Sequence, residues 1–352
     1  MNDNSTLTSP TPSTIRENVP PLFQIIMILV SFTIIGSTLY NQLNYVAYHE
    51  QQPQLEIVTP QKIAEFGGFP DIVKVGLYID QFQKFDLIKN EFIFSGIIWF
   101  LVLPGIISLE TLQKFEFQQS EILYLSPPNV ELKDQELLIS YNIRVKFTAP
   151  LTYIDFPVDD HRINLVFAHQ FITPAEILFE SSRSSFIVKS EVNSFGWTLN
   201  DREVKTGFMS ANLDSTDESK NHNFPAVIFS MDFSRFGTRQ LISILLPLLL
   251  IFYITVFCFS IEPLTSIGLS TGSITAILAY RFVIENLSPK SGYFMLSDYL
   301  FFLILSACFA TFFFNILDVF LLTIPMNIKK MVLIIIHGFV ISVSAYLLLY
   351  LS

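Results

Sequence analysis

Long apolar stretches without charge occupy most of the last third of the chain. Three of them contain no Lys, Arg, Asp or Glu: Leu241 to Ile261, Tyr299 to Leu317 and Met331 to Ser352. A helix of about 20 apolar residues crosses the hydrocarbon core of a bilayer, so each stretch predicts a transmembrane helix. A fourth, Leu264 to Ile284, carries Arg281 near one end, where a long side chain reaches the interface. These segments exclude a fold that lies entirely in water.

The composition agrees with this prediction. Of the 352 residues, 51% are hydrophobic, 36 are Phe and only 15% are charged, whereas about 25% are charged in typical soluble domains. Cys258 and Cys308 both fall in predicted membrane helices. We therefore expect both cysteines to pack as small apolar side chains, and the exported part of the chain to contain no disulfide.

A further apolar stretch, Leu22 to Leu39, lies near the N-terminus. The residues before it are rich in Ser, Thr, Asn and Pro and carry both acidic and basic side chains, which is a poor start for a signal peptide, and no small-residue cleavage site follows. We expect a disordered tail at 1–21 and a retained transmembrane helix at 22–40, with a cleaved signal as the alternative. In either case the hydrophilic residues that follow would be exported.

The hydrophilic segment at about 51–238 predicts one exported domain of strands. Segments rich in Val, Ile, Phe and Tyr with partial alternation are Val73 to Ile79, Glu91 to Leu101, Glu136 to Phe147, Arg162 to Phe167, Phe186 to Glu191 and Ala226 to Phe233. Turn signals separate them at Pro127-Pro128-Asn129, Asp159-Asp160, Asn200-Asp201 and the polar run Asp214 to Asn223. Several short strands with such turns predict an antiparallel β-sandwich.

The residues at 239–352 predict a transmembrane domain of four helices, at about 239–261, 264–286, 294–322 and 331–351. Lys329 and Lys330 lie in the connection before the last helix, which the positive-inside rule places in the cytoplasm. Counting back through the helices puts the β-sandwich outside the membrane. A retained N-terminal helix agrees, because its start would then be cytoplasmic.

The second of these four helices is too polar for a segment that faces only lipid. Between Leu264 and Ala279 it carries several Ser and Thr residues together with Gly268 and Gly272. Lipid cannot form hydrogen bonds with a hydroxyl, so such side chains normally face protein or water. The helix is therefore a candidate pore wall; the alternative is that its small residues only permit close helix packing.

Four motifs follow one another along the chain in a specific order. They are Leu151 to Asp159, with Phe156-Pro157-Val158-Asp159 at its end; Ser234-Arg235 ahead of Pro247; Ile267 to Thr271; and Asn286 to Tyr293. In turn they resemble the aromatic-Pro-x-Asp turn, the pre-membrane Arg and first-helix Pro, the anion-branch pore helix, and the loop between the second and third helices of the pentameric ligand-gated ion channels. Among this Cys-loop receptor superfamily the chain resembles the bacterial members, which lack the disulfide loop.

The resemblance implies a homopentamer in the lipid of a bacterial inner membrane, with the sandwich in the periplasm or outside the cell. It implies a channel for inorganic ions, with cations favoured, that senses an unknown small ligand or protons. The gating residues it implies are Asp159 and Arg235 as an ion pair beside Pro289 and Lys290, with Phe156 and Pro157 in the same turn. His161 is a candidate for titration near neutral pH; a turn histidine without a role is the alternative. No ligand-binding residue is assigned, because Ile122 to Pro127 lacks the family's Trp-x-Pro.

Residues three or four apart share a helix face, and two faces of the second helix are candidates to line the pore. The preferred one turns from polar to apolar, as gating by dewetting requires; this serine face is formed by Ser266, Ser270, Ser273, Ile277 and Tyr280. The alternative, obtained by counting back from Pro289, is a glycine face formed by Gly268, Gly272, Thr275 and Ala279. Glu262 precedes the helix and would form a cation-selective carboxylate ring in a pentamer; a solvated turn carboxylate is the alternative.

Catalysis, a cofactor, a metal site and nucleic-acid binding are not expected. The chain has only five His, no Cys or His pair at metal-ligand spacing, no phosphate-binding glycine loop and no basic patch, and its net charge is −10. Arg281 and Glu285 are spaced for a local ion pair, with a selectivity ring as the alternative. Two functions remain: a ligand-gated channel, and a non-conducting membrane-anchored sensor or binding protein with the same fold.

Overall fold

The computed structural model describes residues 17–43, 48–189, 196–213, 221–235, 239–321 and 324–350. Contacts divide the chain into two units, each described separately below. The sheet unit comprises Tyr45–Gln240 and Ser288–Tyr293, and the helical unit comprises Met1–Asn44, Leu241–Leu287 and Phe294–Ser352. Most of the predicted tail and most of the polar run at 214–223 lie outside the described residues.

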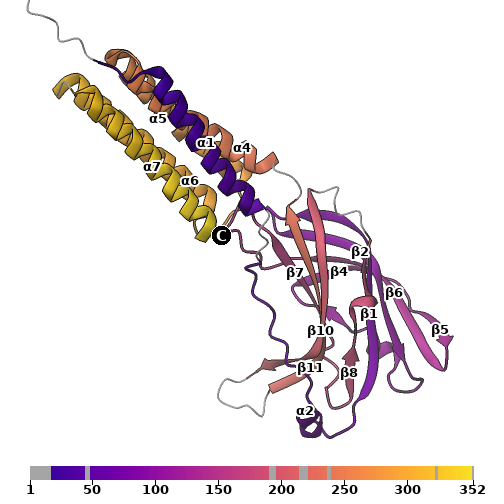
Figure 1. The fold of residues 1–352 in the computed structure, drawn as a ribbon. Helices are drawn as coiled ribbons and strands as arrows, with labels where there is room; N and C mark the ends of the chain where they lie inside the picture. Colours follow the sequence, from indigo (N-terminus) through magenta and orange to yellow (C-terminus); the bar gives the residue numbers. More distant parts are fainter. Residues whose placement is uncertain are drawn as a thin grey trace, which may run out of the picture. The chain divides into compact units, whose positions relative to one another are not determined.

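The sheet unit contains two sheets (Figure 1). The seven-stranded sheet has the order β4-β6-β2-β1-β8, with β5 paired to β6 and β9 paired to β1; the four-stranded sheet has the order β10-β11-β7-β3. The strands are β1 (Asp71–Asp86), β2 (Glu91–Val102), β3 (Glu116–Phe117), β4 (Ser120–Leu125), β5 (Asn129–Lys133), β6 (Glu136–Phe147), β7 (His161–Ala168), β8 (Ile177–Glu180), β9 (Phe186–Val188), β10 (Trp197–Asn212) and β11 (Asn221–Arg235). The short helix α2 (Pro60–Glu65) precedes β1 in the chain, and the short helix α3 (Leu109–Leu112) lies between β2 and β3.

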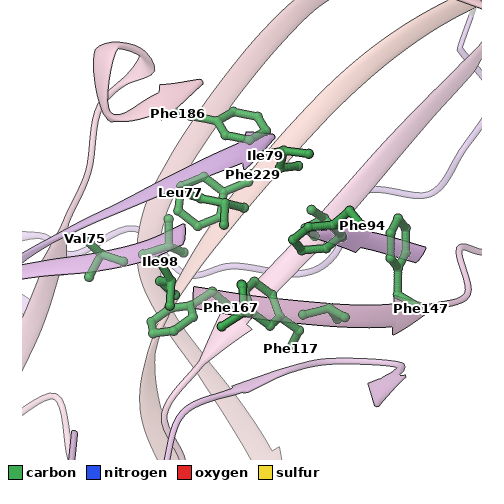
Figure 2. Close-up of a cluster of buried hydrophobic side chains, with 14 of the residues drawn as sticks. Val75, Leu77, Ile79, Phe94, Ile98, Phe117, Phe147, Phe167, Phe186 and Phe229 are labelled. Atoms are coloured by element: carbon green, nitrogen blue, oxygen red, sulfur yellow. The ribbon is translucent and has the colours of Figure 1, made fainter. Parts of the chain in front are cut away.

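Both sheets contribute to one aromatic core. Along β2 the side chains alternate between buried and less buried positions, which is the period of a strand with one face in a core. Figure 2 shows Phe94 of the larger sheet among Phe117 and Phe167 of the smaller one, and the rings of Phe94 and Phe117 meet edge to face at 6.2 Å. Edge-to-face contacts suit the charge distribution of aromatic rings. The shared core makes the two sheets sandwich-like.

The predicted strands are largely confirmed, with one correction. Predicted segments fall within β1, β2, β6, β7 and β11, and Phe186 begins β9. The turn predicted at Asn200-Asp201 is wrong, because these residues continue β10 through a register shift between Leu199 and Asp201, and a bulge accommodates turn-forming residues. The predicted antiparallel arrangement holds for most of the strand pairs, but β8 and β9 pair in parallel with β1. Neither is joined to β1 by a hairpin, which would have imposed the antiparallel direction.

Within the described residues, the helical unit contains five helices that are long and apolar enough to cross a membrane. They are α1 (Pro21–Leu43), α4 (Arg239–Val256), α5 (Pro263–Leu287), α6 (Leu296–Ile316) and α7 (Met326–Tyr350). A 3-10 turn at Phe257–Ser260 continues α4, and a π turn at Leu317–Leu321 continues α6. Figure 1 shows the five helices running alongside one another. All five predicted spans therefore appear as helices.

Polar contacts join the beginning of α1 to the end of α4. The backbone N–H of Val19 donates to the carbonyl of Phe259 (3.0 Å), and the Ser260 hydroxyl donates to the carbonyl of Val19 (2.7 Å). One turn further on, the buried amide of Gln24 donates to the carbonyl of Val256 (2.9 Å). Water does not compete for such bonds at membrane depth, so they fix α1 antiparallel to α4.

Candidate functional site

A buried ion pair lies at the centre of the polar residues in the sheet unit. Arg235, at the end of β11, donates from Nη2 to Oδ1 of Asp159 (2.8 Å) and to its Oδ2 (3.1 Å). The side chain of Asp159 is only 2% exposed. Arg235 also lies over the ring of Trp197 at 4.4 Å and over Phe156 at 5.6 Å, where cation–π attraction adds to the pairing. The structure thus brings together the predicted pair Asp159 and Arg235 and places Phe156 beside it.

A second buried pair extends this cluster to the segment that follows α1. His161 is fully buried, and it donates from Nε2 to Asp159 (2.7 Å) and from Nδ1 to Glu50 (2.7 Å). The other carboxylate oxygen of Glu50 accepts the backbone N–H of Arg162 at 3.0 Å. We call Glu50, Asp159, His161 and Arg235 the charged cluster. Both imidazole nitrogens face carboxylates, which is the arrangement that suits the doubly protonated ring.

The surroundings move the pKa values of these groups in opposite directions. Burial opposes the charged form of His161, but its hydrogen bonds to Asp159 and Glu50 outweigh burial and raise the pKa to about 9. Burial also opposes charge on Asp159, but Arg235 and His161 outweigh it and lower the pKa to about 2. Titration of His161 near neutral pH was only a candidate suggested by its residue type, and the raised pKa speaks against it. The neighbouring Asp160 is the group near that range, because burial raises its pKa to about 6.

Stability of the sheet unit should fall as the pH rises from about 6.5 to 9. The pKa of His161 is raised from 6.5 to about 9 in the folded chain, so the charged ring stabilises the fold fully below pH 6.5, and this contribution disappears as the pH rises through 9. We expect His161→Gln to remove this part of the pH dependence of the urea midpoint, measured by tryptophan fluorescence. His222→Gln, which removes an exposed hydrogen bond, is the control. An unchanged slope in His161→Gln would contradict the assignment.

The loop Ser288–Tyr293 belongs to the sheet unit and reaches the same turn as the charged cluster. The backbone N–H of Tyr153 donates to the hydroxyl of Tyr293 (2.8 Å), and the Tyr153 hydroxyl donates to the carbonyl of Leu87 (2.5 Å). The rings of Tyr153 and His161 meet edge to face at 5.2 Å. Pro289 is buried and Lys290 is exposed. Tyr153 therefore links the loop to the charged cluster.

In the helical unit the two faces of α5 have different surroundings. Ser266, Ser270, Ser273 and Ile277 of the serine face are buried against the chain's own helices, and the hydroxyl of Tyr280 donates to the carbonyl of Ser243 in α4. The serine hydroxyls donate to carbonyls of their own helix, as from Ser273 to Leu269 at 2.9 Å. The glycine face, Gly268, Gly272, Thr275 and Ala279, is exposed. The neighbouring helices therefore cover the serine face and leave the glycine face uncovered.

Charged side chains lie at both ends of this helix. Glu262 is exposed immediately before α5. At the other end Arg281 pairs with Glu285 (3.0 Å), as predicted, and also with the buried Asp298 of α6. Asp298 accepts the backbone N–H of Met295 (2.9 Å) and so caps α6. The second partner makes Arg281 a link between two helices, which favours the local ion pair over a ring.

Lys329 is less free than its place in a short connection predicted. It lies in α7 with its side chain 4% exposed and pairs with Asp318 at 2.7 Å. Asp318 also accepts the backbone N–H of Ile324 at 3.1 Å. Lys330 lies over the ring of Phe23 at 5.8 Å. Lys329 is thus a buried ion-pair partner within the helical unit, whereas Lys330 contacts an aromatic ring of α1.

A cavity of about 450 Å³ lies on the outer face of the seven-stranded sheet. Its apolar lining comes from Ile97, Trp99 and Leu101 of β2 and Leu138 of β6, and charged residues of the β5–β6 hairpin border it. Trp99 lies over Gly76 of β1, where a Cβ would stand 2.1 Å from the indole. Glycine at position 76 thus allows the indole to lie flat against the sheet. The volume is within the range of small-molecule sites.

Sequence reasoning did not assign roles to Glu50, Trp197, Trp99, Tyr293 or Asp298. Tyr293 belonged to a motif that was recognised, and Asp298 has the position of a helix-capping acid, so local signals for these two existed. Glu50 and Trp197 are far from Asp159 in sequence, and only folding brings them together. No protein-family model matches the chain, and no curated protein matches it either.

Proposed function

We propose that this chain is the subunit of a homopentameric ligand-gated ion channel, with α5 lining the pore and the sheet unit sensing a ligand or protons. The observation that carries the proposal is the character of α5. It is the least apolar of the five candidate spans and, with α1, the least buried by its own chain. Its exposed glycine face carries the hydroxyl of Thr275 and bare backbone at Gly268 and Gly272. The Thr275 hydroxyl donates to the carbonyl of Thr271 in its own helix (3.1 Å), and its oxygen can still accept a hydrogen bond from water on a shared axis, which lipid does not offer.

Chain connectivity supports a gating role for the charged cluster. Glu50 follows α1 in the sequence, Arg235 precedes α4, and the loop Ser288–Tyr293 joins α5 to α6. The first two connections thus each carry a residue of the cluster close by in the sequence. The third, the loop Ser288–Tyr293, is hydrogen-bonded to Tyr153, whose ring contacts His161. A change in the sheet unit that alters the cluster would act on three connections at once. Two discrete arrangements of such a cluster are the kind of element that couples sites.

The apolar cavity over Trp99 is the proposed ligand site. It opens on the outer face of one sheet, so a neighbouring copy would complete it. Asp160, whose pKa burial raises to about 6, is the group through which protons would act. A ligand that binds in a cavity between two copies would stabilise one arrangement of the subunits over another. This is how a ligand shifts a conformational equilibrium.

The proposed location is the bacterial inner membrane, with the sheet unit on the periplasmic or outer side. Lys330 marks the cytoplasmic end of the helices, and the contacts of Val19 and Gln24 put the start of α1 at the same end as the end of α4. These contacts support a retained α1 over a cleaved signal peptide.

Glu262 should set the preference for cations. It is exposed at the start of α5, and five copies would concentrate carboxylates at the cytoplasmic mouth of the pore. We expect Glu262→Gln to reduce the cation-to-anion permeability ratio, measured as a shift of the reversal potential in a salt gradient, with little change in assembly. Glu285→Gln, which removes a carboxylate already paired with Arg281, is the matched control. An equal reversal potential in Glu262→Gln and the unaltered protein would remove Glu262 from the selectivity mechanism.

Recording of unitary currents tests the proposal directly. Purified protein in planar bilayers should conduct, with openings that depend on pH or on added small molecules, and electron micrographs should show five-fold particles. Five-fold particles that never conduct across pH and ligand screens would instead favour a non-conducting sensor of the same fold. Particles without five-fold symmetry would contradict the pentamer itself.

A further inference from the structure

The segment Glu50–Glu56, here called the strap, lies on the four-stranded sheet and is attached to it at three points. Glu50 binds His161 of β7, and the side-chain Oε1 of Gln52 accepts a hydrogen bond from Lys205 of β10 (2.8 Å). Glu56 exchanges backbone hydrogen bonds with Phe208 (2.9 and 3.0 Å). Leu55 packs beside the buried residues Ala168, Phe224 and Ala226. The strap is therefore held by its ends and its middle rather than lying loosely over the sheet.

A cavity of about 450 Å³ lies between the strap and the strands beneath it. Its lining is rich in carboxamides, which come from Gln51, Gln52, Gln54, Gln118, Gln119 and Asn164. Val166 and Met209 contribute apolar surface on the sheet side. The cavity is separate from the proposed ligand site, which lies on the other sheet.

The two charged residues in this lining are already neutralised by protein partners. Glu50 binds His161 and the backbone N–H of Arg162. The guanidinium of Arg162 binds both oxygens of Asp232 (2.6 and 2.7 Å) and one oxygen of Glu203 (3.2 Å). A charged ligand would lose hydration without gaining a free counter-charge here. The lining thus disfavours ions.

The polar capacity that remains is carboxamide. Among the contacts of the described residues, the side chains of Gln51, Gln54 and Gln119 have no hydrogen bond, and Asn164 uses only its carbonyl oxygen, which accepts from Ser230 (2.7 Å). A carboxamide offers two N–H donors and one carbonyl acceptor. Hydroxyl groups, which both donate and accept, match this set, and the C–H faces of a ring would match Val166 and Met209.

We infer that the strap cavity binds a small uncharged polyhydroxylated molecule of the size of a monosaccharide. The volume falls within the range of small-ligand sites, and the ligand would bind between the strap and the sheet. Because the strap begins at Glu50, a ligand bound in the strap cavity would act on the same carboxylate that binds His161. The inference goes beyond the proposed channel and does not depend on conduction.

Binding by the full-length protein in a detergent without a sugar headgroup tests the inference. The probes are D-glucose, D-galactose and myo-inositol, with glucuronate and glucosamine as charged analogues, and saturation-transfer NMR reports binding. We expect saturable binding of at least one neutral probe and weaker binding of the charged analogues. Gln51→Leu and Gln54→Leu should each weaken binding about three- to tenfold, the effect of one neutral hydrogen bond. Gln119 is unsuitable because its φ of 53° makes the turn sensitive to substitution.

Gln61→Leu is the matched control, since Gln61 is exposed on α2 outside the cavity, and it should bind as the unaltered protein does. Met209→Trp, which fills the cavity from the sheet side, should abolish binding while the tryptophan-monitored unfolding midpoint shows that the sheet unit is folded. The inference is overturned if none of the neutral probes binds, if the charged analogues bind more tightly, or if Gln51→Leu, Gln54→Leu and Met209→Trp all leave binding unchanged. A channel that fails to conduct leaves these binding results unaffected.

Discussion

Replacing Asp159 by alanine should lower the free energy of unfolding of the sheet unit by about 3–5 kcal/mol, the usual cost of removing one partner of a buried ion pair. The effect is large because Asp159 is buried and serves two cations, Arg235 and His161. Its removal leaves both without their shared carboxylate. Urea unfolding followed by tryptophan fluorescence reports this unit alone, since both Trp residues of the chain, Trp99 and Trp197, lie in it.

An exposed ion pair in the same unit is the control for this experiment. The side chains of Arg183 and Asp201 are 66% and 51% exposed, and such pairs contribute about 0–1 kcal/mol. Asp201→Ala should therefore change stability little. In the double variant Asp159→Ala with Arg235→Gln the loss should be smaller than the sum of the two single losses, because the partners interact. A loss in Asp159→Ala no larger than in Asp201→Ala would show that the charged cluster does not stabilise the fold.

Cysteine substitution of the two α5 faces should give opposite results. We expect thiol reagents added in water to modify Gly272→Cys and Thr275→Cys and to abolish most of the current, since these residues are exposed and would line the pore. A Cβ at Gly272 has nothing within 4 Å, so the substitution fits. Ser270→Cys and Ser273→Cys, which replace buried residues, should react many times more slowly. Cys258 and Cys308 are replaced by alanine in the background.

The control for general access is a cysteine on the lipid-exposed side of another helix. Phe313→Cys on α6 is exposed in the chain and should stay unmodified by a membrane-impermeant reagent, which cannot enter lipid. Faster modification at Ser273→Cys than at Thr275→Cys would restore the serine face as the pore wall. Protection of both faces in open and closed conditions would rule out α5 as the lining of a water-filled path.

Much of the fold follows from patterns that are local in the sequence. Each predicted membrane segment became a helix, because about 20 apolar residues with satisfied backbone bonds form one wherever they lie. Glu136–Phe147 was predicted with the bounds of β6, since alternation fixes both the strand and its buried face. β5 was missed because it is exposed along its whole length, so no apolar alternation marked it. β8 was missed although three of its four residues are buried, because so short a strand shows no alternation. The Asn200-Asp201 bulge in β10 carried a turn signal because the same residues suit turns and bulges.

The candidate site was only partly visible in this way. Asp159 and Arg235 were paired from motifs, and the structure brings them within 2.8 Å. Glu50 was not found, because its partner His161 lies far along the chain and nothing in either neighbourhood specifies the other. Residue type alone made His161 a candidate for titration near neutral pH, whereas two carboxylates, which the sequence does not place beside it, raise its pKa to about 9.

The sequence by itself determined that five segments of this chain are helices of membrane-crossing length and that the segment between the first helix and the other four is built from strands, since length and periodicity of apolar residues decide both. Only the tertiary structure decided which face of α5 is covered. Helical periodicity defines the serine and glycine faces equally well, but burial of Ser266, Ser270 and Ser273 depends on neighbouring helices far along the chain. The partners of buried charges were decided in the same way, because an ion pair depends on distance in space and not on spacing in sequence.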